Sequence, residues 1–425
     1  MEFRDFQKIE RVNRIEKAVS PNLEAAGISR RDQEMAWISD ADGYLGFRIA
    51  GNVYSTRSGM ANWFNVEVDR FTELMIGAMD RPVEPEIVPV PSYYKEAAID
   101  ELPIPTYYKG DGGPYVTSGI FHSGFDGKYN LSFHRMMYLG GGRFGVRVVP
   151  RHLNALMKEA ESRGRELRAV VSIGADPASL LAGSSSADFG TDEFGIASAL
   201  HMKGEGRPLE LFEPFDDALR APVGTEIVLA GRFLWERIPE GPFVDITSTY
   251  DRKGLDPGEP VFQVEKVLIR EDPIMHVLLP GGLEHYLLMG LPKEPAILRS
   301  VRKVVPRVNG VRLTEGGCCW LHSVISIGKQ KEGDAKNAVM AAFSGHPSMK
   351  SVIVVDGDID IFNDRDVEWA VATRFQADRD LVVVRKARGS TLDPSADPAD
   401  GTTSKTGFDA TIPLGSADDF RRVDE

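Results

Sequence analysis

The chain has very little cysteine: its 425 residues include two, the adjacent pair Cys318 and Cys319. This scarcity excludes a disulfide framework and a cysteine-based zinc site, and it makes the cytosol the expected compartment. No run of about 18 consecutive apolar residues is present. The charged start MEFRDFQKIERVNRIEKA also lacks the apolar segment of a signal peptide. We therefore expect a soluble, cytoplasmic protein with no membrane partner.

Positive charge is also in short supply, with 50 Lys and Arg against 63 Asp and Glu and a formal net charge of −13. A nucleic-acid partner is not expected, because phosphate contacts need clustered Lys and Arg. Nucleotide-binding motifs are missing too, since Gly140–Gly142 does not fit G-x-G-x-x-G opening a helix. The acidic run Asp356–Asp360 resembles a calcium loop, but Ile361 and Val367 stand where that loop needs Gly and Glu. A strand ending in an acidic turn is the favoured interpretation.

What is present suits an ordinary globular protein, 42% hydrophobic and 27% charged, long enough for two or three domains. A proline-rich passage, Arg81–Pro105, indicates a boundary that we place near residue 112. Strand-like segments then alternate irregularly with helical ones such as Pro150–Arg163, which is typical of an α+β domain. The expected domains are 1–112, 113–314 and 315–425.

The last domain reads as a βαβ-type unit. Val352–Val355 is a continuous β-branched run, as in a strand buried on both faces. Asp364–Phe375 has the acidic first turn of a helix, and Leu381–Val384 reads as the next strand. The segment from Gly389 to Glu425 is rich in Asp, Pro, Ser and Thr, and we expect it to be a lid-like arm or a loosely held end.

Candidate functional residues lie in two apolar, strand-like segments, Tyr129–Met137 and Val148–Leu153. Asn130, Arg135 and His152 are the polar side chains embedded in them. Taken singly, each of these residues is better explained as a structural polar group than as a ligand. Two more pieces follow along the chain: Ala169–Pro177 with its continuation through Gly183–Ser186 to Thr191–Ala197, and Glu240–Asp245.

In this order and spacing, the four pieces resemble the UbiD family of reversible decarboxylases, which use prenylated FMN. Two C-terminal passages, Val354–Arg374 and Leu392–Thr411, resemble the same family. The likeness covers roughly residues 95–411, whereas the first 90 or so match loosely. It implies a mixed α/β, α+β fold, in which a central flavin-binding, split-barrel-like domain is flanked by a small N-terminal α/β domain and a C-terminal α/β oligomerisation domain.

The resemblance also implies a cofactor site. In the family, an Asn, a His and a Glu hold the flavin phosphate through a divalent metal, and the matching residues are Asn130, His152 and Glu193. These donors suit Mn²⁺ or Mg²⁺, with K⁺ as a further candidate ion, and the adjacent Asp192 could replace Glu193 as the ligand. Further residues at cofactor-contacting positions are Ser132, Phe133, Arg135, Arg151, Ser184, Ser185 and Lys405. A flavin prenyltransferase is the implied supplier of prenylated FMN.

The catalytic trio of the family corresponds to Arg135, Glu240 and Asp245. Residues five apart point away from each other on a strand or a helix, so the two carboxylates need a bend to meet, and Gly241–Pro242 supplies one. An arginine can orient both carboxylates, and one carboxyl group must carry a proton for the carbon that loses CO₂. The sequence does not separate Glu240 from Asp245 as the donor, and an ion pair beside a turn is the plain alternative.

For the substrate, the segment Glu284–Pro295 resembles a shorter-chain branch that includes furan-dicarboxylate decarboxylases and archaeal enzymes acting on anhydromevalonate phosphate. His285 and Lys293 occupy positions near the substrate pocket of that branch, although a plain helix surface is an equal alternative. Lys293 replaces the arginine expected for furan dicarboxylate. Trp320 makes the neighbouring glycine-rich segment more apolar than a dianion needs.

We therefore expect decarboxylation of a heteroaromatic mono-acid of the indole, pyrrole or furan type, in either direction, with the acid and CO₂ as small-molecule partners. The alternative is a non-aromatic enoic acid such as anhydromevalonate phosphate. A non-catalytic flavin-binding scaffold or an FMN oxidoreductase would be a different class of protein. The resemblance further implies a homodimer or a higher homo-oligomer.

Overall fold

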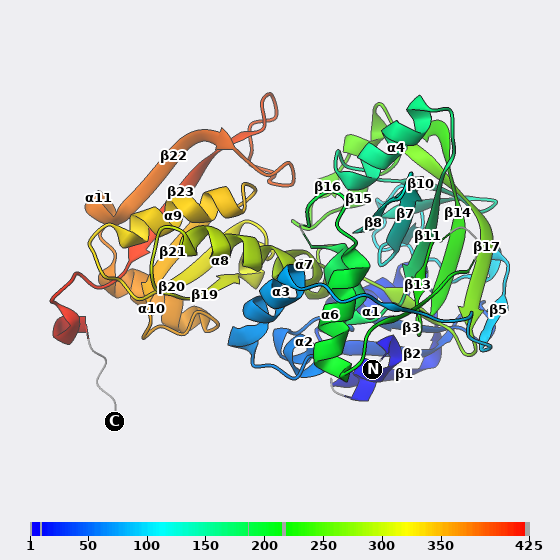
Figure 1. Cartoon of the computed structure of the whole chain (residues 1–425), viewed down its shortest axis with the longest axis horizontal. Helices are drawn as coiled ribbons and strands as arrows, with labels where there is room; N and C mark the ends of the chain where they lie inside the picture. Colours follow the sequence, from blue (N-terminus) through cyan, green and yellow to red (C-terminus); the bar gives the residue numbers. More distant parts are fainter. Residues whose placement is uncertain (1, 9–10, 186, 215–217, 421–425) are drawn as a thin grey trace. The chain divides into compact units, whose positions relative to one another are not determined.

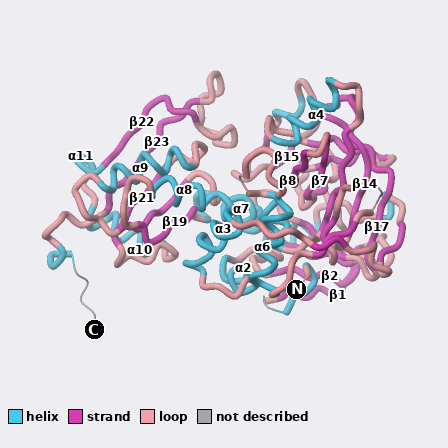
Figure 2. Tube along the Cα trace, viewed as in Figure 1, coloured by secondary structure: helices cyan, strands magenta, loops and turns pink. Residues whose placement is uncertain are grey.

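The computed structural model describes residues 2–8, 11–185, 187–214 and 218–420. The chain forms two compact units, Met1–Leu288 and Met289–Glu425. Helices and strands are mixed throughout both units, as Figures 1 and 2 show. The expected mixed α/β fold is confirmed, while the boundaries at residues 112 and 314 stay predictions.

The first unit contains a small sheet to which distant parts of the chain contribute. Its strand order is β1-β2-β3-β18, and β18 pairs in parallel with β3 although more than 200 residues separate them. The elements are β1 (Val12–Val19), β2 (Met35–Ala41), β3 (Arg48–Gly51) and β18 (Ile274–Val277), with α1 (Glu24–Arg31), α2 (Arg57–Trp63) and α3 (Phe71–Asp80) from the same region of the sequence.

A nine-stranded, largely antiparallel sheet dominates the first unit, in the order β6-β9-β10-β17-β14-β11-β7-β8, with β5 pairing β17. Its members are β5 (Tyr94–Glu96), β6 (Tyr115–Val116), β7 (Ile120–Phe125), β8 (Lys128–Phe133), β9 (Met136–Gly140), β10 (Arg143–Val146), β11 (Leu167–Ile173), β14 (Ile227–Ile238) and β17 (Glu259–Arg270). Shorter strands are β4 (Glu86–Ile87), β12 (Glu210–Phe212), β13 (Ala221–Pro222), β15 (Phe243–Val244) and β16 (Tyr250–Asp251).

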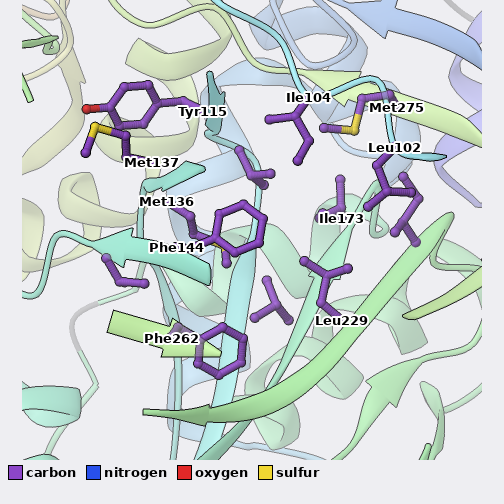
Figure 3. Packing of buried hydrophobic residues seen from close by; sticks show 14 of the residues in the cluster. Leu102, Ile104, Tyr115, Met136, Met137, Phe144, Ile173, Leu229, Phe262 and Met275 are labelled. Atoms are coloured by element: carbon purple, nitrogen blue, oxygen red, sulfur yellow. The ribbon is translucent and has the colours of Figure 1, made fainter. Parts of the chain in front are cut away.

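The core of this unit is packed from the inward faces of these strands (Figure 3). Phe144, Leu229 and Phe262 come from β10, β14 and β17 and are fully buried. Met275 of β18 belongs to the same cluster, so one continuous core joins the small sheet to the large one. Continuous burial of this kind gives the strands that carry functional residues a rigid support.

Helix α4 (His152–Ser162) lies between β10 and β11 in the chain, and α5 (Pro177–Gly183) and α6 (Glu193–Glu205) follow β11. The predicted strand and turn at Ala169–Pro177 are confirmed, because β11 ends at Ile173 and Asp176 caps α5, accepting a hydrogen bond from the Ser179 N–H at 3.0 Å. The buried α6 starts on the acidic pair singled out in the sequence, Asp192 and Glu193.

The second unit contains a five-stranded sheet in the order β19-β20-β21-β23-β22. Its elements are α8 (Glu294–Arg302), β19 (Val308–Leu313), β20 (His322–Ile327), α9 (Asp334–Gly345), β21 (Ser351–Asp356), α10 (Asp364–Arg374), α11 (Ala377–Asp380), β22 (Leu381–Arg388) and β23 (Thr402–Ala410). The division between the units falls within α7 (Leu283–Gly290).

The expectation of an arm or loose end after Gly389 is wrong. Residues 402–410 form β23, an inner strand that pairs in parallel with β21 and antiparallel with β22. The strand is hard to recognise because polar residues, including Lys405 and Asp409, occupy its buried positions. Residues 421–425 lie outside the described residues.

Within the described part of the chain, no helix is long and apolar enough to cross a membrane.

A buried histidine of the central sheet gives the first testable prediction. His122 of β7 accepts the Arg220 N–H at 2.9 Å, and burial, together with the charge of Arg220, lowers its pKa to about 3. In the unfolded chain, His122 binds a proton near pH 6.5, whereas in the folded chain it stays neutral at that pH. The free energy of unfolding of the protein therefore decreases as pH falls below 6.5. We expect this effect to cost about 2 kcal/mol of unfolding free energy between pH 7 and pH 5.

Urea unfolding of wild type and His122→Asn at the two pH values measures this effect. Asparagine keeps an acceptor for Arg220 but cannot take up a proton, so the loss on acidification should shrink by about that 2 kcal/mol. An equal acid loss in both proteins would contradict the assignment to His122.

Candidate active site

The first cluster of buried polar side chains is centred on Arg135, in the link between β8 and β9. Its side chain is 9% exposed, and the guanidinium donates to both oxygens of Glu240, from Nε to Oε1 at 3.0 Å and from Nη2 to Oε2 at 2.8 Å. Nη1 donates to Asp245 Oδ2 at 2.9 Å. An arginine keeps its charge in such surroundings, so it can hold two carboxylates at fixed positions.

Glu240 and Asp245 lie in the loop after β14, which contains the hairpin β15–β16. Gly241 has φ +106°, a conformation that other residues rarely adopt. A Cβ atom at Gly254 would lie 2.4 Å from Glu240 Oε2, so a glycine is needed where the returning loop passes the carboxylate. These two glycines turn the chain so that carboxylates five residues apart reach one guanidinium.

The two carboxylates have different surroundings. Glu240 is fully buried, and its Oε1 also accepts the Tyr115 hydroxyl at 2.9 Å. Burial and the charge of Glu240 raise the pKa of Tyr115, so the phenol stays a donor. Asp245 is 18% exposed, with Oδ1 accepting the Ile246 N–H at 2.6 Å. Glu240 thus has its acceptor sites occupied by Arg135 and Tyr115, whereas Asp245 reaches the surface.

The sequence did not identify three neighbours of Arg135. The ring centre of Phe243 lies 4.4 Å from its guanidinium carbon, and Asp251 Oδ2 lies 3.3 Å from its Nη2. Tyr115 is the third, and it reaches Arg135 through Glu240. Phe243 lies inside the piece Glu240–Asp245 and could have been singled out there, but nothing in the local sequence marks Tyr115 or Asp251.

His285 of α7 lies close to this cluster. It is half-buried, and its Nδ1 accepts the Gly281 N–H at 3.1 Å. Loss of hydration lowers the pKa of His285, while the charges of Asp245 and Arg135 act on it in opposite directions. Both charges therefore lie within electrostatic reach of the imidazole. A neutral histidine beside an arginine and a carboxylate can accept or donate a hydrogen bond to a bound anion.

A second cluster joins β8, α4 and α6. Glu193 Oε2 accepts the Leu131 N–H at 3.0 Å, and Glu193 Oε1 lies 3.9 Å from His152 Nδ1. Asn130 precedes Leu131 and donates from Nδ2 to Ser132 Oγ at 2.7 Å. The structure therefore places Glu193 next to His152 and next to the backbone N–H of Leu131, the residue that follows Asn130.

The alternative ligand Asp192 has a different position. As the N-cap of α6, it accepts the Phe194 N–H through Oδ1 at 2.9 Å. This capping bond leaves the next residue, Glu193, as the carboxylate that extends toward Leu131 and His152.

The electrostatics of this second cluster fit a divalent cation. Burial raises the pKa of Glu193 to about 7, against the opposing effect of the Leu131 N–H. Burial, with the charge of Arg151, lowers the pKa of His152, which keeps the imidazole neutral as a ligand must be. Carboxylate, imidazole and amide oxygen together suit Mn²⁺ or Mg²⁺. Among the residues that the structure describes, no group of three or more His, Cys, Asp or Glu side chains could hold a metal.

The other predicted cofactor contacts in the first unit lie within about ten residues of Asn130, His152 or Glu193 in the chain. Ser132 Oγ lies 2.8 Å from His134 Nε2, and the Ser184 hydroxyl donates to the Leu180 carbonyl at 3.0 Å. Ser185 Oγ is buried without a hydrogen-bond partner in the described part of the chain, as expected of a group that faces a polar ligand. Phe133 ends β8, Arg151 is the exposed N-cap of α4, and Ser186 lies outside the described residues.

Three predicted residues belong to the second unit. Trp320 is buried there, donating from Nε1 to Ser390 Oγ at 3.1 Å and packing edge-on against His346. Lys405 of β23 is buried and donates to the Pro347 carbonyl, with the Phe343 ring 5.3 Å away. Burial lowers the pKa of Lys405. Lys293 is buried at the start of α8.

Profiles of one family match almost the whole chain. They are described as the N-terminal, Rift-related and C-terminal domains of 3-octaprenyl-4-hydroxybenzoate carboxy-lyase, UbiD, and they match residues 4–79, 83–283 and 286–410. Among solved structures, the UbiD-class enzyme HmfF from Pelotomaculum thermopropionicum in complex with FMN has a TM-score of 0.93 and 37% identity, over 100% of this chain and 97% of that chain.

Curated relatives bear on the substrate. The anhydromevalonate phosphate decarboxylase of Methanothermobacter thermautotrophicus is 45% identical over 96% of both chains. The protein of that name from Methanocaldococcus jannaschii is 44% identical over 91% of this chain and 90% of its own length. Five archaeal relatives with this name are 40–45% identical.

The expectation of a heteroaromatic acid as the substrate is therefore wrong, and the relatives support the enoic-acid alternative. The family profiles and these relatives cover almost the whole chain, and this coverage shows the family and the type of enzyme. The chain belongs to the UbiD family and is a carboxy-lyase.

Proposed function

We propose that the protein decarboxylates anhydromevalonate phosphate or a closely related phosphorylated enoic acid. The observation that carries this proposal is the convergence of Glu240 and Asp245 on Arg135, an arrangement able to hold one carboxylate charged and to deliver a proton from the other. The substrate class comes from the archaeal relatives, which are 40–45% identical.

We further propose prenylated FMN as the cofactor. A solved UbiD-class structure, 34% identical and with a TM-score of 0.89, is described in complex with it. When bound, this flavin supplies the electron sink that no side chain offers for the electron pair left by departing CO₂. Its phosphate and a Mn²⁺ or Mg²⁺ ion, with K⁺ as an additional candidate, would be held by Asn130, His152 and Glu193, and the flavin by Ser132, Phe133, Arg135, Arg151, Ser184 and Ser185. Lys405, which belongs to the second unit, remains a prediction as a cofactor contact. A flavin prenyltransferase would supply the cofactor.

The surroundings of the carboxylates support separate roles for them. Glu240 accepts two hydrogen bonds from Arg135 and one from Tyr115, so it fixes the orientation of the guanidinium. Asp245 accepts one bond from Arg135 and has access to solvent, from which it can regain a proton. We assign proton donation to Asp245. The carbon that loses CO₂ takes the Asp245 proton, and water then restores it.

His285 is the candidate substrate contact in the same unit. Its Nδ1 accepts the Gly281 N–H, so a neutral His285 carries its proton on Nε2, as a donor to an anionic group requires. Lys293 and Trp320 remain predictions as substrate contacts. The contacts of Trp320 with Ser390 and His346 give it a structural role in the second unit.

The proposed function is tested by co-expression with a flavin prenyltransferase, followed by measurement of CO₂ release from anhydromevalonate phosphate. Indole-, pyrrole- and furan-carboxylates are the comparison substrates. Faster turnover of the phosphorylated enoic acid than of any ring acid is expected. A protein that carries prenylated FMN but releases no CO₂ from the enoic acid would contradict the proposal. A protein that carries plain FMN reducible by a nicotinamide would favour an oxidoreductase, and one that binds flavin without turnover a scaffold.

We also propose that the protein is a homodimer or higher homo-oligomer that pairs through β22. This strand ends the five-stranded sheet, yet Leu381, Val383 and Val384 are 37%, 45% and 37% exposed. An exposed apolar edge strand invites pairing with a second chain. One solved relative is described as an evolved dimeric form.

Replacing Val383 by Lys should therefore convert the assembly to a 46.8 kDa monomer in size-exclusion chromatography with light scattering. The matched control is Val304→Lys, which places the same charge on a 47% exposed valine of the same unit. An unchanged mass for the Val383 variant, or a wild type that is already monomeric, would contradict pairing through β22.

A further inference from the structure

Arg135 faces a third carboxylate besides Glu240 and Asp245. Asp251 is 7% exposed, and its Oδ2 accepts from Arg135 Nη2 at 3.3 Å. It lies on β16 opposite Phe243 of β15, whose ring covers the guanidinium. The register of this short hairpin thus places a carboxylate and an aromatic ring against the same arginine.

A second arginine supports Asp251. Arg147 Nε lies 4.0 Å from Asp251 Oδ2, and Arg147 also forms an ion pair with Glu259, which accepts the Val148 N–H at 3.1 Å. The other oxygen of Asp251, Oδ1, accepts the Lys253 N–H at 3.0 Å. Asp251 is therefore held from its own loop and from the β10–α4 connection, and both oxygens have donors.

Asp251 is ionised in this setting. Burial raises its pKa, but the Lys253 N–H and the charges of Arg135, Lys253 and Arg147 outweigh burial and hold the pKa below its usual value. Charged or titratable groups around this region include Tyr115, Arg135, Arg147, Glu240, Asp245, Tyr250, Arg252, Lys253, Glu259 and His285, with Asp111 beyond Tyr115.

Two consequences follow for Arg135. Its Nε and both Nη groups donate to carboxylates in different directions, so the guanidinium cannot rotate without losing a bond. Three carboxylates also share this one cation at contact distance, with Arg147 4.0 Å from the third. The excess negative charge favours a proton on one of them.

We propose that Asp251 is a positioning residue of the decarboxylase site, one that locks the orientation of Arg135 and whose charge helps the cluster to retain the proton used in catalysis. The second half of this inference rests on the proposed function. The first half concerns Arg135 alone and can be measured without turnover.

The experiment compares wild type, Asp251→Asn, Asp251→Glu and Asp256→Asn. Asp256 is an exposed aspartate of the same loop and serves as the matched control. In cofactor-free protein with ¹⁵N-labelled arginine, the Arg135 Nη–H signals, which include the Nη2 group that donates to Asp251, are assigned by their loss in Arg135→Lys. Hydrogen exchange at Arg135 should accelerate about tenfold or more in Asp251→Asn, a change expected when one charge-assisted hydrogen bond is lost. Asp251→Glu should restore part of the protection, and Asp256→Asn should match wild type.

In the loaded enzyme, the alkaline limb of the kcat/KM profile should move about one pH unit lower in Asp251→Asn, at unchanged flavin content. Unchanged exchange at Arg135 would overturn the positioning role. An unmoved pH limb, or activity lost together with flavin, would overturn the electrostatic role. A wild type that releases no CO₂ would contradict the proposed function, and the exchange measurement would still decide whether Asp251 locks Arg135.

Discussion

Replacing Asp245 by Asn should reduce turnover of anhydromevalonate phosphate by about 10²- to 10⁴-fold, the usual effect of losing a positioned proton donor. Asparagine has nearly the same shape, and its Oδ1 can still accept from Arg135 Nη1, which lies 2.9 Å from Asp245 Oδ2 in the wild type. It cannot give a proton to carbon. The measurement is steady-state CO₂ release, with flavin absorbance to show that the cofactor is retained.

A second measurement separates loss of proton donation from loss of the whole site. Exchange of labelled CO₂ into unreacted substrate needs no proton, so it should persist in Asp245→Asn while net decarboxylation falls. Asp256→Asn, at an exposed position of the same loop, should retain both activities. If Asp245→Asn kept normal net turnover, Glu240 would have to be the donor, despite its full burial and its three hydrogen bonds.

The sequence predicted the centre of this site because the family resemblance placed Arg135, Glu240 and Asp245 together, and Gly241–Pro242 offered the bend that they need. Asp251 was beyond reach, since its contact with Arg135 depends on the pairing of two-residue strands. The pattern of a two-residue strand is too short to reveal its register. Contacts that depend on the pairing of such short strands, like that of Asp251 with Arg135, cannot be predicted from the sequence of this chain.

The two errors of sequence analysis have a common physical cause, because both inferred a role from the polarity of a segment. The polar segment Thr402–Ala410 is an inner strand, since Lys405 and Asp409 are accommodated at its buried positions. The apolar surroundings of Trp320 supported a ring acid as the substrate, but its indole contacts Ser390 and His346. In each case, the polarity of the segment reflects how its side chains pack within the second unit and does not indicate what the protein binds.

Replacing Glu193 by Gln should remove the metal and lower flavin affinity by at least about 10- to 100-fold, because loss of a supporting residue near a metal already costs that much. The buried Glu193 carboxylate lies between the Leu131 N–H and the neutral His152 imidazole, and no Lys or Arg lies within ion-pair distance of it in the described chain. Glutamine can still accept the Leu131 N–H, so the fold should persist while the negative charge is lost.

The measurement is metal content by elemental analysis, together with flavin content after co-expression with the prenyltransferase. The matched control is Glu161→Gln, an exposed glutamate of α4, the helix that begins at His152. The control should keep both ligands at the wild-type ratio. Metal and flavin retained in Glu193→Gln would show that Asp192, the cap of α6, is the ligand instead. Flavin retained without metal would instead mean that the hydroxyl and backbone groups around Ser185 hold the phosphate without a metal bridge.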